Sequence, residues 1–276
     1  MQLRCAGRVL ELDRPVVMGV LNVTPDSFSD GGRYLDPDHA LDRALELEAE
    51  GADIIDLGGE STRPGATPID EGEELARVIP AIEAVRARTA TPISIDTMKP
   101  AVARAAVAAG ASLWNDVCAL HAPGALEAAA ELGCGVVLMH MQGQPATMQA
   151  DPRYDDVVAE VTQFLEARAP SAMAAGVARE RIWLDPGLGF GKTLAHNLEL
   201  IRGLPRLAAL GFPVLAGASR KGMIRALDPS AAAATDRLGG SLAIALAAAR
   251  AGAAMVRVHD VRETVQALTV DAAIHG

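Results

Sequence analysis

The sequence contains few aromatic residues and few cysteines. The first shortage limits the side chains from which a core can be built, and the second argues against stabilising cysteine sites. Aromatic side chains make up only 3% of the 276 residues, whereas 50% of the residues are hydrophobic, so a core must be built from alanine, valine, leucine and isoleucine. The three cysteines, Cys5, Cys118 and Cys134, are odd in number and form no C-x-x-C pair. This pattern argues against a disulfide framework and a structural zinc site, and it is typical of a reducing compartment.

Long apolar runs and an excess of positive charge are also missing. No uninterrupted apolar stretch approaches the roughly 20 residues that a membrane-spanning helix needs, and the amino-terminal segment carries charges in place of an apolar signal sequence. The formal net charge of -10 argues against general nucleic-acid binding, which requires a surface that neutralises phosphates. We therefore expect a cytoplasmic globular protein without a membrane or nucleic-acid partner, although a local basic pocket for a small anion remains compatible with this charge.

Short apolar runs alternate with longer helical patterns along the whole chain. The runs, each rich in valine, isoleucine or leucine, are residues 16–23, 53–59, 92–96, 113–117, 135–140, 182–185, 213–219 and 255–259. The stretches between them, such as 39–50, 72–88, 100–109, 154–175 and 238–251, repeat apolar residues three and four positions apart. Eight buried strands, each followed by a helix, predict an α/β fold of the (β/α)8 TIM-barrel type in one domain, 1–276. An open doubly wound sheet is the alternative, because periodicity does not reveal whether a sheet closes.

Polar residues stand at the carboxyl ends of the predicted strands, where TIM-barrel active sites lie. They are Asn22, Asp56, Asp96, Asn115, Asp116, His140, Asp185, Lys221, Arg257 and His259. A buried carboxylate is costly unless it is paired, so this concentration of polar groups indicates a polar ligand. Some members have simpler interpretations: Asp56 is expected to support the barrel internally, and His140 is expected to be a structural histidine. For Asp96 the alternative is a cap of the following helix, and for Asp185 it is a turn with Pro186 and Gly187.

The eighth predicted strand suggests an anion site. Arg257 and His259 are two positions apart and therefore share one face of the strand. Arg220 and Lys221 follow the seventh strand, and barrels often bind phosphate at the ends of strands seven and eight. The alternative is that each cation forms a structural salt bridge to an aspartate or glutamate, which is less expected for all four together.

Three glycine-rich loops follow predicted strands. The segment GLGFGKT at 187–193 resembles a phosphate-binding P-loop, but Pro186 stands where the first glycine is required, so a nucleoside triphosphate site is not supported. The segments SDGG at 29–32 and GGESTRPG at 58–65 are interpreted as loops that close over a site, with Arg63 as a further anion contact. Flexible connectors are the alternative for both.

Seven segments, in order from the first predicted strand to the last, carry a specific combination of residues. They are MGVLNVTPDSFSDGG at 18–32, DLGGESTRPG at 56–65, SIDT at 94–97, ND at 115–116, DPGLGFGK at 185–192, SRK at 219–221 and RVHD at 257–260. Together they resemble the motifs of the bacterial dihydropteroate synthase family. The resemblance implies a pterin-binding barrel of folate biosynthesis, with Mg2+ as cofactor and a homodimeric assembly.

The resemblance also implies a reaction and a set of site residues. A transferase of this family joins 6-hydroxymethyl-7,8-dihydropterin pyrophosphate to 4-aminobenzoate, giving 7,8-dihydropteroate and pyrophosphate. By similarity, the pterin would be held by Asp96, Asn115, Asp185 and Lys221, with Met139 packed on its ring. The pyrophosphate would meet Thr62, Arg63, Arg257 and His259, Mg2+ would be bound by Asn22 with Asp30 nearby, and 4-aminobenzoate would be surrounded by Phe28, Pro64, Phe190, Arg220 and Gly222. The residues expected to be catalytic are Asp30, Arg63, Lys221, Arg257 and His259.

The expected chemistry requires no strong general base. Loss of pyrophosphate leaves a positive charge on the methylene carbon that is delocalised into the dihydropterin, which favours an SN1-like path, and the cationic side chains would stabilise the departing anion. One position departs from the family, because Gly222 stands where a serine is usual. Two alternatives share the pterin barrel: a methyltetrahydrofolate-binding methyltransferase, which would not need the Thr62-Arg63 loop or the Arg257–His259 pair, and a catalytically silent paralogue.

Overall fold

A parallel barrel forms the centre of the molecule. The computed structural model of the protein describes residues 2–5, 8–11, 15–24, 37–63 and 65–275. The strands of the barrel are β3 (Val16–Asn22), β4 (Ile54–Gly58), β5 (Ile93–Asp96), β6 (Leu113–Asp116), β7 (Gly135–Met139), β8 (Ile182–Asp185), β9 (Leu215–Ala216) and β10 (Met255–Val258). They form one eight-stranded sheet in the order β8-β7-β6-β5-β4-β3-β10-β9, and a parallel bridge between Leu184 and Val214 joins its two ends. The predicted TIM barrel is therefore confirmed, and the open doubly wound sheet is wrong.

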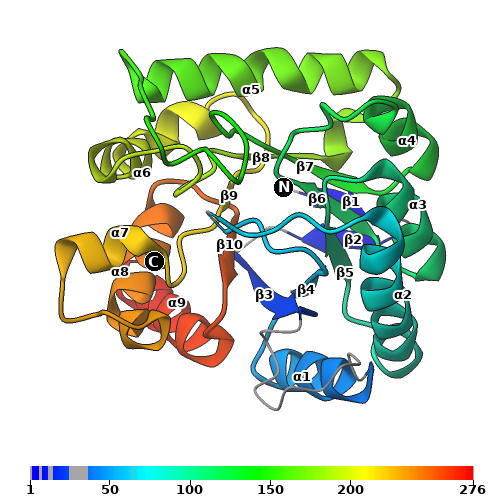
Figure 1. Ribbon diagram of the computed structural model, residues 1–276. Coiled ribbons are helices and arrows are strands. Elements are labelled where there is room, and N and C mark those ends of the chain that lie inside the picture. Colours follow the sequence, from blue (N-terminus) through cyan, green and yellow to red (C-terminus); the bar gives the residue numbers. More distant parts are fainter. Residues whose placement is uncertain (1, 6–7, 12–14, 25–36, 64, 276) are drawn as a thin grey trace.

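Helices surround the barrel on its outside (Figure 1). They are α1 (Pro37–Ala49), α2 (Glu71–Arg88), α3 (Pro100–Ala109), α4 (Ala125–Leu132), α5 (Val157–Ala174), α6 (Leu194–Ala208), α7 (Gly222–Leu227), α8 (Leu238–Arg250) and α9 (Val261–His275), with short 3-10 turns η2 (Arg179–Arg181) and η3 (Ala234–Arg237). Side-chain caps fix where the longest of them begin: Asp70 accepts a hydrogen bond from the Glu73 amide before α2, and Asp156 accepts one from the Ala159 amide before α5. None of the helices in the described residues is long and apolar enough to cross a membrane.

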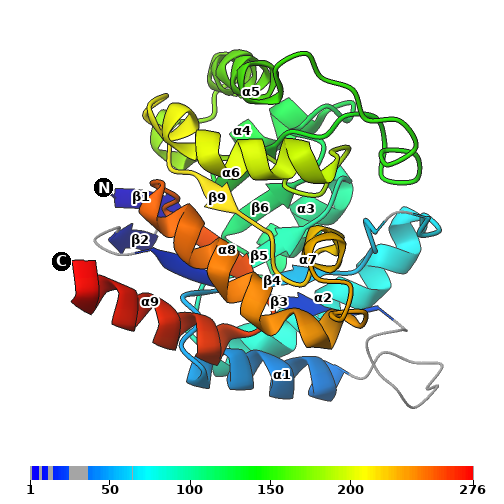
Figure 2. The same ribbon diagram turned by 90° about the vertical axis from the view of Figure 1, so that its left-hand side faces the viewer.

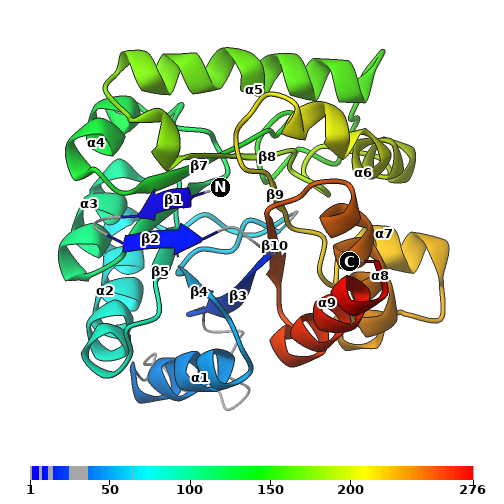
Figure 3. The ribbon, with the colours of Figure 1, turned by 180° about the vertical axis from the view of Figure 1, so that it is seen from behind.

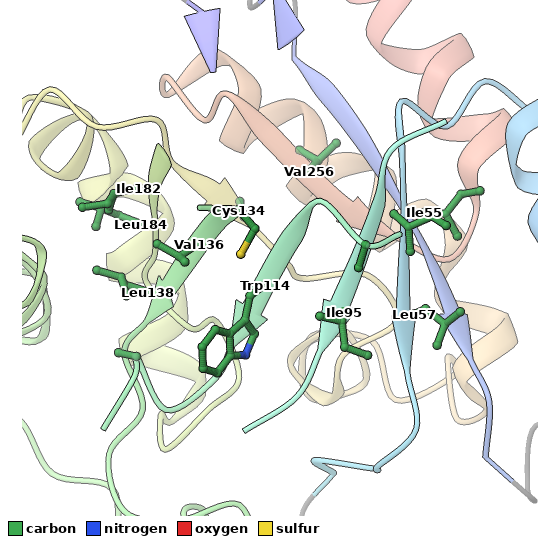
Figure 4. Packing of buried hydrophobic residues seen from close by; sticks show 14 of the residues in the cluster. Ile55, Leu57, Ile95, Trp114, Cys134, Val136, Leu138, Ile182, Leu184 and Val256 are labelled. Atoms are coloured by element: carbon green, nitrogen blue, oxygen red, sulfur yellow. The ribbon is translucent and has the colours of Figure 1, made fainter. Parts of the chain in front are cut away.

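The hydrophobic core has two layers, one on each side of the sheet. The larger layer lies between the strands and the helices, and Figure 4 shows part of it, including Ile55, Leu57 and Trp114. The smaller layer fills the inside of the barrel and consists of Val16, Met18, Ile54, Leu113, Val137, Trp183, Leu215 and Met255. Side chains alternate between the two layers because successive residues of a strand point to opposite faces. The inner layer is a packed floor beneath the polar residues at the strand ends.

Two features of the fold were not predicted. An antiparallel hairpin of β1 (Gln2–Cys5) and β2 (Arg8–Glu11) precedes the barrel and lies across the end at which the barrel strands begin (Figures 2 and 3). The predicted strand over 213–219 is also shorter than expected, because β9 pairs with β10 only through Leu215 and Ala216 before the chain turns away.

Candidate active site

The polar residues at the strand ends form a second layer inside the barrel, directly above the apolar inner layer. Four of them, and the apolar Met139, follow a residue of the inner layer by two positions in the same strand: Asp56 follows Ile54, Asn115 follows Leu113, Met139 follows Val137, Asp185 follows Trp183, and Arg257 follows Met255. Residues two apart in a strand share a face. Asp96 pairs in register with Gly58 and Asn115, so it joins the same layer from β5. The structure thus brings the predicted pterin residues of β5, β6, β7 and β8 together with Arg257 of β10, a predicted pyrophosphate contact, at the carboxyl end of the barrel.

Arg257 is paired with two carboxylates of this layer. Its Nε donates to Asp56 Oδ2 over 2.6 Å, and its Nη2 donates to Asp96 Oδ2 over 2.8 Å. Burial alone would lower the pKa of Arg257, but the two carboxylates raise it above its ordinary value. Burial raises the pKa of Asp96 to about 7 even though Arg257 opposes this shift. The alternative of a structural salt bridge, weighed above, therefore describes Arg257 in this structure, and Asp56 supports the barrel end as expected by binding the arginine.

Asp185 ends β8, and Lys221 follows β9, the strand that pairs with β10 and thus lies next to Arg257. Asp185 is buried, and its Oδ1 accepts a hydrogen bond from the Gly187 amide over 2.7 Å. Burial raises the pKa of Asp185, and the Gly187 amide and Lys221 oppose this shift. Burial lowers the pKa of Lys221 to about 8, although Asp185 opposes it. Lys221 Nζ donates to the Leu188 carbonyl and lies 4.3 Å from the centre of the Phe190 ring.

The predicted anion corner contains cations that already have partners. His259 Nδ1 lies 3.1 Å from Ser219 Oγ, and burial together with Arg257 lowers the pKa of this histidine to about 3, so the ring is neutral. Arg220 binds the Asp260 carboxylate through Nε, over 3.0 Å, and through Nη2. Arg220, like Arg257, thus forms an ion pair within the chain. An anion that enters this corner would share these guanidinium groups with Asp260, Asp56 and Asp96.

The loop after β4 carries Thr62 and Arg63, which are partly and largely exposed. One carboxylate holds the two ends of this loop together, because Glu60 Oε1 accepts a hydrogen bond from the Ile69 amide over 3.1 Å. Glu60 Oε2 is in turn bound by Lys99 Nζ over 2.7 Å. The two predicted pyrophosphate contacts therefore lie on a segment whose base is fixed and whose tip is open to solvent.

Three predicted site residues, Phe28, Asp30 and Pro64, lie outside the described residues. Asn22, the predicted magnesium ligand, is the last residue of β3 and is paired in register with Gly58. In the part of the chain that the structure describes, no three histidine, cysteine, aspartate or glutamate residues gather into a group suited to a metal ion.

This geometry agrees with what comparison with known proteins shows. The profile of the pterin binding enzymes matches residues 18–259. The dihydropteroate synthase of Escherichia coli is 50% identical over 273 residues, which cover 98% of this chain and 95% of that protein. The dihydropteroate synthase of Haemophilus influenzae is 48% identical over 271 residues, which cover 98% of this chain and 98% of that protein. The chain belongs to the dihydropteroate synthase family.

Solved structures of the dihydropteroate synthase family superpose on almost the entire chain. The Xanthomonas albilineans enzyme with 4-aminobenzoic acid gives a TM-score of 0.94 at 55% identity, and the alignment covers 100% of this chain and 98% of that one. The same enzyme in complex with 7,8-dihydropteroate gives a TM-score of 0.91 at 52% identity, with 100% and 99% of the two chains covered.

Gly222, the departure from the family pattern, opens α7 with Lys221 as the capping residue. Apart from Gly222 itself, its two chain neighbours and the adjoining helix backbone, no heavy atom of the described residues lies within 4 Å of the position that a Cβ on Gly222 would occupy. A serine side chain would therefore fit at this position, so packing does not require the glycine.

Sequence reasoning missed two residues beside the site, Lys99 and Lys192. The missed signal is composition: only three of the 25 basic residues are lysines, and Lys99, Lys192 and Lys221 all follow barrel strands at the carboxyl end. Since every other basic residue counted here is an arginine, a lysine at these three positions indicates that a compact ammonium group is needed.

Proposed function

We propose that the chain is a transferase that condenses 6-hydroxymethyl-7,8-dihydropterin pyrophosphate with 4-aminobenzoate, giving 7,8-dihydropteroate and pyrophosphate. The observation that carries the proposal is the polar layer of Asp96, Asn115 and Asp185 with Lys221 and Arg257, held above an apolar floor at the carboxyl end of the barrel. The near full-length relatives of the same name and the solved complexes with 4-aminobenzoic acid and 7,8-dihydropteroate support it.

Asp185 is the proposed anchor of the pterin ring. The 2-amino group and the neighbouring ring N–H of a pterin form an edge with two donors, which a carboxylate accepts side by side. The Gly187 amide occupies one acceptor site of Asp185 and fixes the orientation of the carboxylate. Lys221 has two further N–H donors beyond the one bound to Leu188, so it can also donate to a ring oxygen or nitrogen.

Arg257 and His259 are proposed to stabilise the pyrophosphate as it leaves. The guanidinium of Arg257 carries five N–H donors, and the two ion pairs to Asp56 and Asp96 use one each, so donors remain for a phosphate oxygen. Neutral His259 can donate through Nε2, and a nearby anion would raise its pKa. Arg63 and Thr62 would add contacts from the loop after β4. Stabilising the leaving anion in this way lowers the barrier to an SN1-like departure, after which the already nucleophilic amine of 4-aminobenzoate attacks the methylene carbon.

Mg2+ is the proposed cofactor. Asn22 offers an amide oxygen at the mouth of the barrel, which fits a hard cation that takes few protein ligands and completes its shell with water and substrate phosphates. When bound, Mg2+ would offset negative charge on the pyrophosphate leaving group. Asp30 would be the nearby carboxylate.

The proposal also includes assembly and location. We propose a single domain over 1–276 that acts as a homodimer in the cytoplasm. The unbroken alternation of strands and helices supports the single domain, the family resemblance supports the dimer, and the cysteine pattern supports a reducing compartment. Light scattering on the purified protein would test the dimer.

A coupled assay for released pyrophosphate tests the proposed reaction. The expected result is sustained release that requires both the pterin pyrophosphate and 4-aminobenzoate. A silent pterin-binding paralogue would bind the pterin without sustained release. A methyltetrahydrofolate-binding methyltransferase would bind the methylated folate and would release no pyrophosphate.

A further inference from the structure

The glycine loop between β8 and α6, residues 186–192, has a backbone that only glycine allows. Three alternating glycines have positive φ angles: 67° at Gly187, 81° at Gly189 and 60° at Gly191. A Cβ atom at these positions would collide with the His140 carbonyl, with the Lys221 side chain and with the Gln142 carbonyl, respectively. The loop is therefore packed directly against the residues that follow β7 and against Lys221.

Four consecutive carbonyl groups of this loop each accept a hydrogen bond from a different side chain. Lys221 Nζ donates to Leu188, Gln149 Nε2 donates to Gly189 over 2.6 Å, Lys192 Nζ donates to Phe190 over 2.9 Å, and Tyr154 Oη donates to Gly191 over 2.9 Å. From the other side, the Gly189 amide donates to Asn197 Oδ1 over 2.6 Å. The loop has no regular secondary structure to satisfy its backbone, and these side chains take over that role.

Lys192 is the most deeply buried of the four donors, with 3% of its surface exposed. Burial lowers the pKa of Lys192 to about 7, although Asp185 opposes this shift. In its protonated form the side chain has three N–H donors, and three acceptors surround it: Phe190 O at 2.9 Å, His140 Nδ1 at 3.0 Å and His140 O at 3.2 Å. Burial and the adjacent Lys192 lower the pKa of His140 to about 3, so its ring is neutral and Nδ1 can accept. The lysine therefore ties the end of β7 to the backbone of Phe190.

The position of Phe190 connects this buried contact to the active site. The Phe190 ring lies beside Lys221 Nζ, and Lys221 is bound to the Leu188 carbonyl of the same loop. A planar guanidinium does not present three donors in the tetrahedral arrangement that these acceptors require. This explains why a lysine stands here in a chain whose other basic residues are almost all arginines.

We infer that Lys192 is a positioning residue: through the Phe190 carbonyl it holds the glycine loop as a preformed wall of the site, with Gln149 and Tyr154 as supporting donors. It does not contact substrate. The inference rests on the proposed function in one respect, because it takes Phe190 to face the 4-aminobenzoate. Without Lys192 the loop would have to be ordered each time that substrate binds, which weakens binding.

The test is Lys192→Met, which keeps the length of the side chain and removes all three donors. Hydrogen–deuterium exchange of the ligand-free protein should become faster in the peptide that covers 187–191. In steady-state kinetics, the KM for 4-aminobenzoate should rise about tenfold, with kcat changed less than about twofold and with a smaller loss of hydroxymethylpterin affinity, because the Gly187 amide of the same loop orients Asp185. Lys99→Met is the matched control. Lys99 is a partly buried lysine at the carboxyl end of the barrel, and it binds Glu60 and Glu74 in place of the glycine loop. In this control, exchange at 187–191 should stay as in the unaltered chain.

Several results would overturn the inference. Unchanged exchange at 187–191 in a folded Lys192→Met protein would do so, as would equal changes in the KM values of both substrates. If Lys192→Met does not fold, Tyr154→Phe carries the test, because it removes only the donor to the Gly191 carbonyl; faster exchange with a raised KM for 4-aminobenzoate supports the wall, and wild-type behaviour refutes it. Absence of dihydropteroate formation by the unaltered chain would refute the proposed function alone, since the exchange measurement does not depend on activity.

Discussion

Replacing Arg257 with alanine should destabilise the protein in a manner that depends strongly on pH. The Arg257 side chain is 22% exposed. Its guanidinium binds the carboxylate of Asp56, whose side chain is fully buried, and that of Asp96, whose side chain is 14% exposed. Removing one partner of such a buried pair costs about 3–5 kcal/mol in the free energy of unfolding, because carboxylates are left buried without a counter-charge. We expect this full loss near pH 8.5, which lies above the pKa of about 7 that Asp96 has beside Arg257.

The magnitude at lower pH follows from the titration of Asp96. Its pKa is raised to about 7 with Arg257 present and would be higher without it. A carboxyl group whose pKa is raised by folding binds more protons in the folded state, so its contribution is full at low pH and is lost as the pH rises through the folded pKa. Between pH 7 and 8.5 the free energy of unfolding of the variant continues to fall, because Asp96 is still protonated in the folded variant. In the unaltered chain this fall has ended, because Asp96 is already ionised above its pKa of about 7. At roughly 1.4 kcal/mol per pH unit, the penalty should be about 2 kcal/mol smaller at pH 5.5 than at pH 8.5.

Urea unfolding at the two pH values, followed by the fluorescence of buried Trp114 and Trp183, measures this difference. Arg250→Ala is the control, because Arg250 forms its ion pair with Asp271 at the surface; it should cause little change at either pH. An Arg257→Ala penalty that is the same at pH 5.5 and pH 8.5 would refute the coupling between Arg257 and Asp96. In binding experiments, the Arg257→Ala substitution should lower the affinity for the pyrophosphorylated pterin more than the affinity for hydroxymethylpterin.

Three further predictions concern single positions. Gly222→Ser should lower the KM for 4-aminobenzoate by roughly fivefold, about 1 kcal/mol, because a hydroxyl adds one hydrogen bond where nothing within 4 Å obstructs it; a raised KM in steady-state kinetics would contradict this. Gly187→Ala should destabilise the fold by about 2–5 kcal/mol in urea unfolding, since its φ of 67° and the His140 carbonyl leave no room for a methyl group; unfolding like that of the unaltered chain would count against the described loop. Cys134 should remain unmodified by iodoacetamide at pH 8 in the native protein, because burial raises its pKa to about 11; alkylation at the same rate as in urea, detected by peptide mass spectrometry, would show otherwise.

The sequence predicts the barrel and the residues of the polar layer. It does not predict which side chains of that layer form hydrogen bonds and ion pairs with one another. Period-two patterning places Asp185 above Trp183 and Arg257 above Met255, since alternation along a strand is a local property. The partners of Arg257 are not local: Asp56 and Asp96 come from strands that become neighbours only when the barrel closes.

The supporting contacts of the glycine loop were missed for a related reason. Lys192 belongs to a segment whose resemblance to a P-loop draws attention to phosphate, whereas its acceptors lie on its own loop and on His140, 52 residues away. Only the scarcity of lysine in the sequence indicates that this position is unusual.

The polar layer above the apolar barrel floor is proposed to bind a pterin and to support its condensation with 4-aminobenzoate. The most direct measurement is the initial rate of 7,8-dihydropteroate formation, identified by mass, for the unaltered chain and for Asp185→Asn. Asparagine keeps an oxygen for the Gly187 amide, so the variant should fold, but it lacks the charge that strengthens pairing with the pterin edge. The account predicts product from the unaltered chain and a kcat/KM for the pterin substrate that is roughly ten- to a hundredfold lower in the variant, from the loss of about 1.5–3 kcal/mol. No dihydropteroate from the unaltered chain, or equal rates from both proteins, would contradict it.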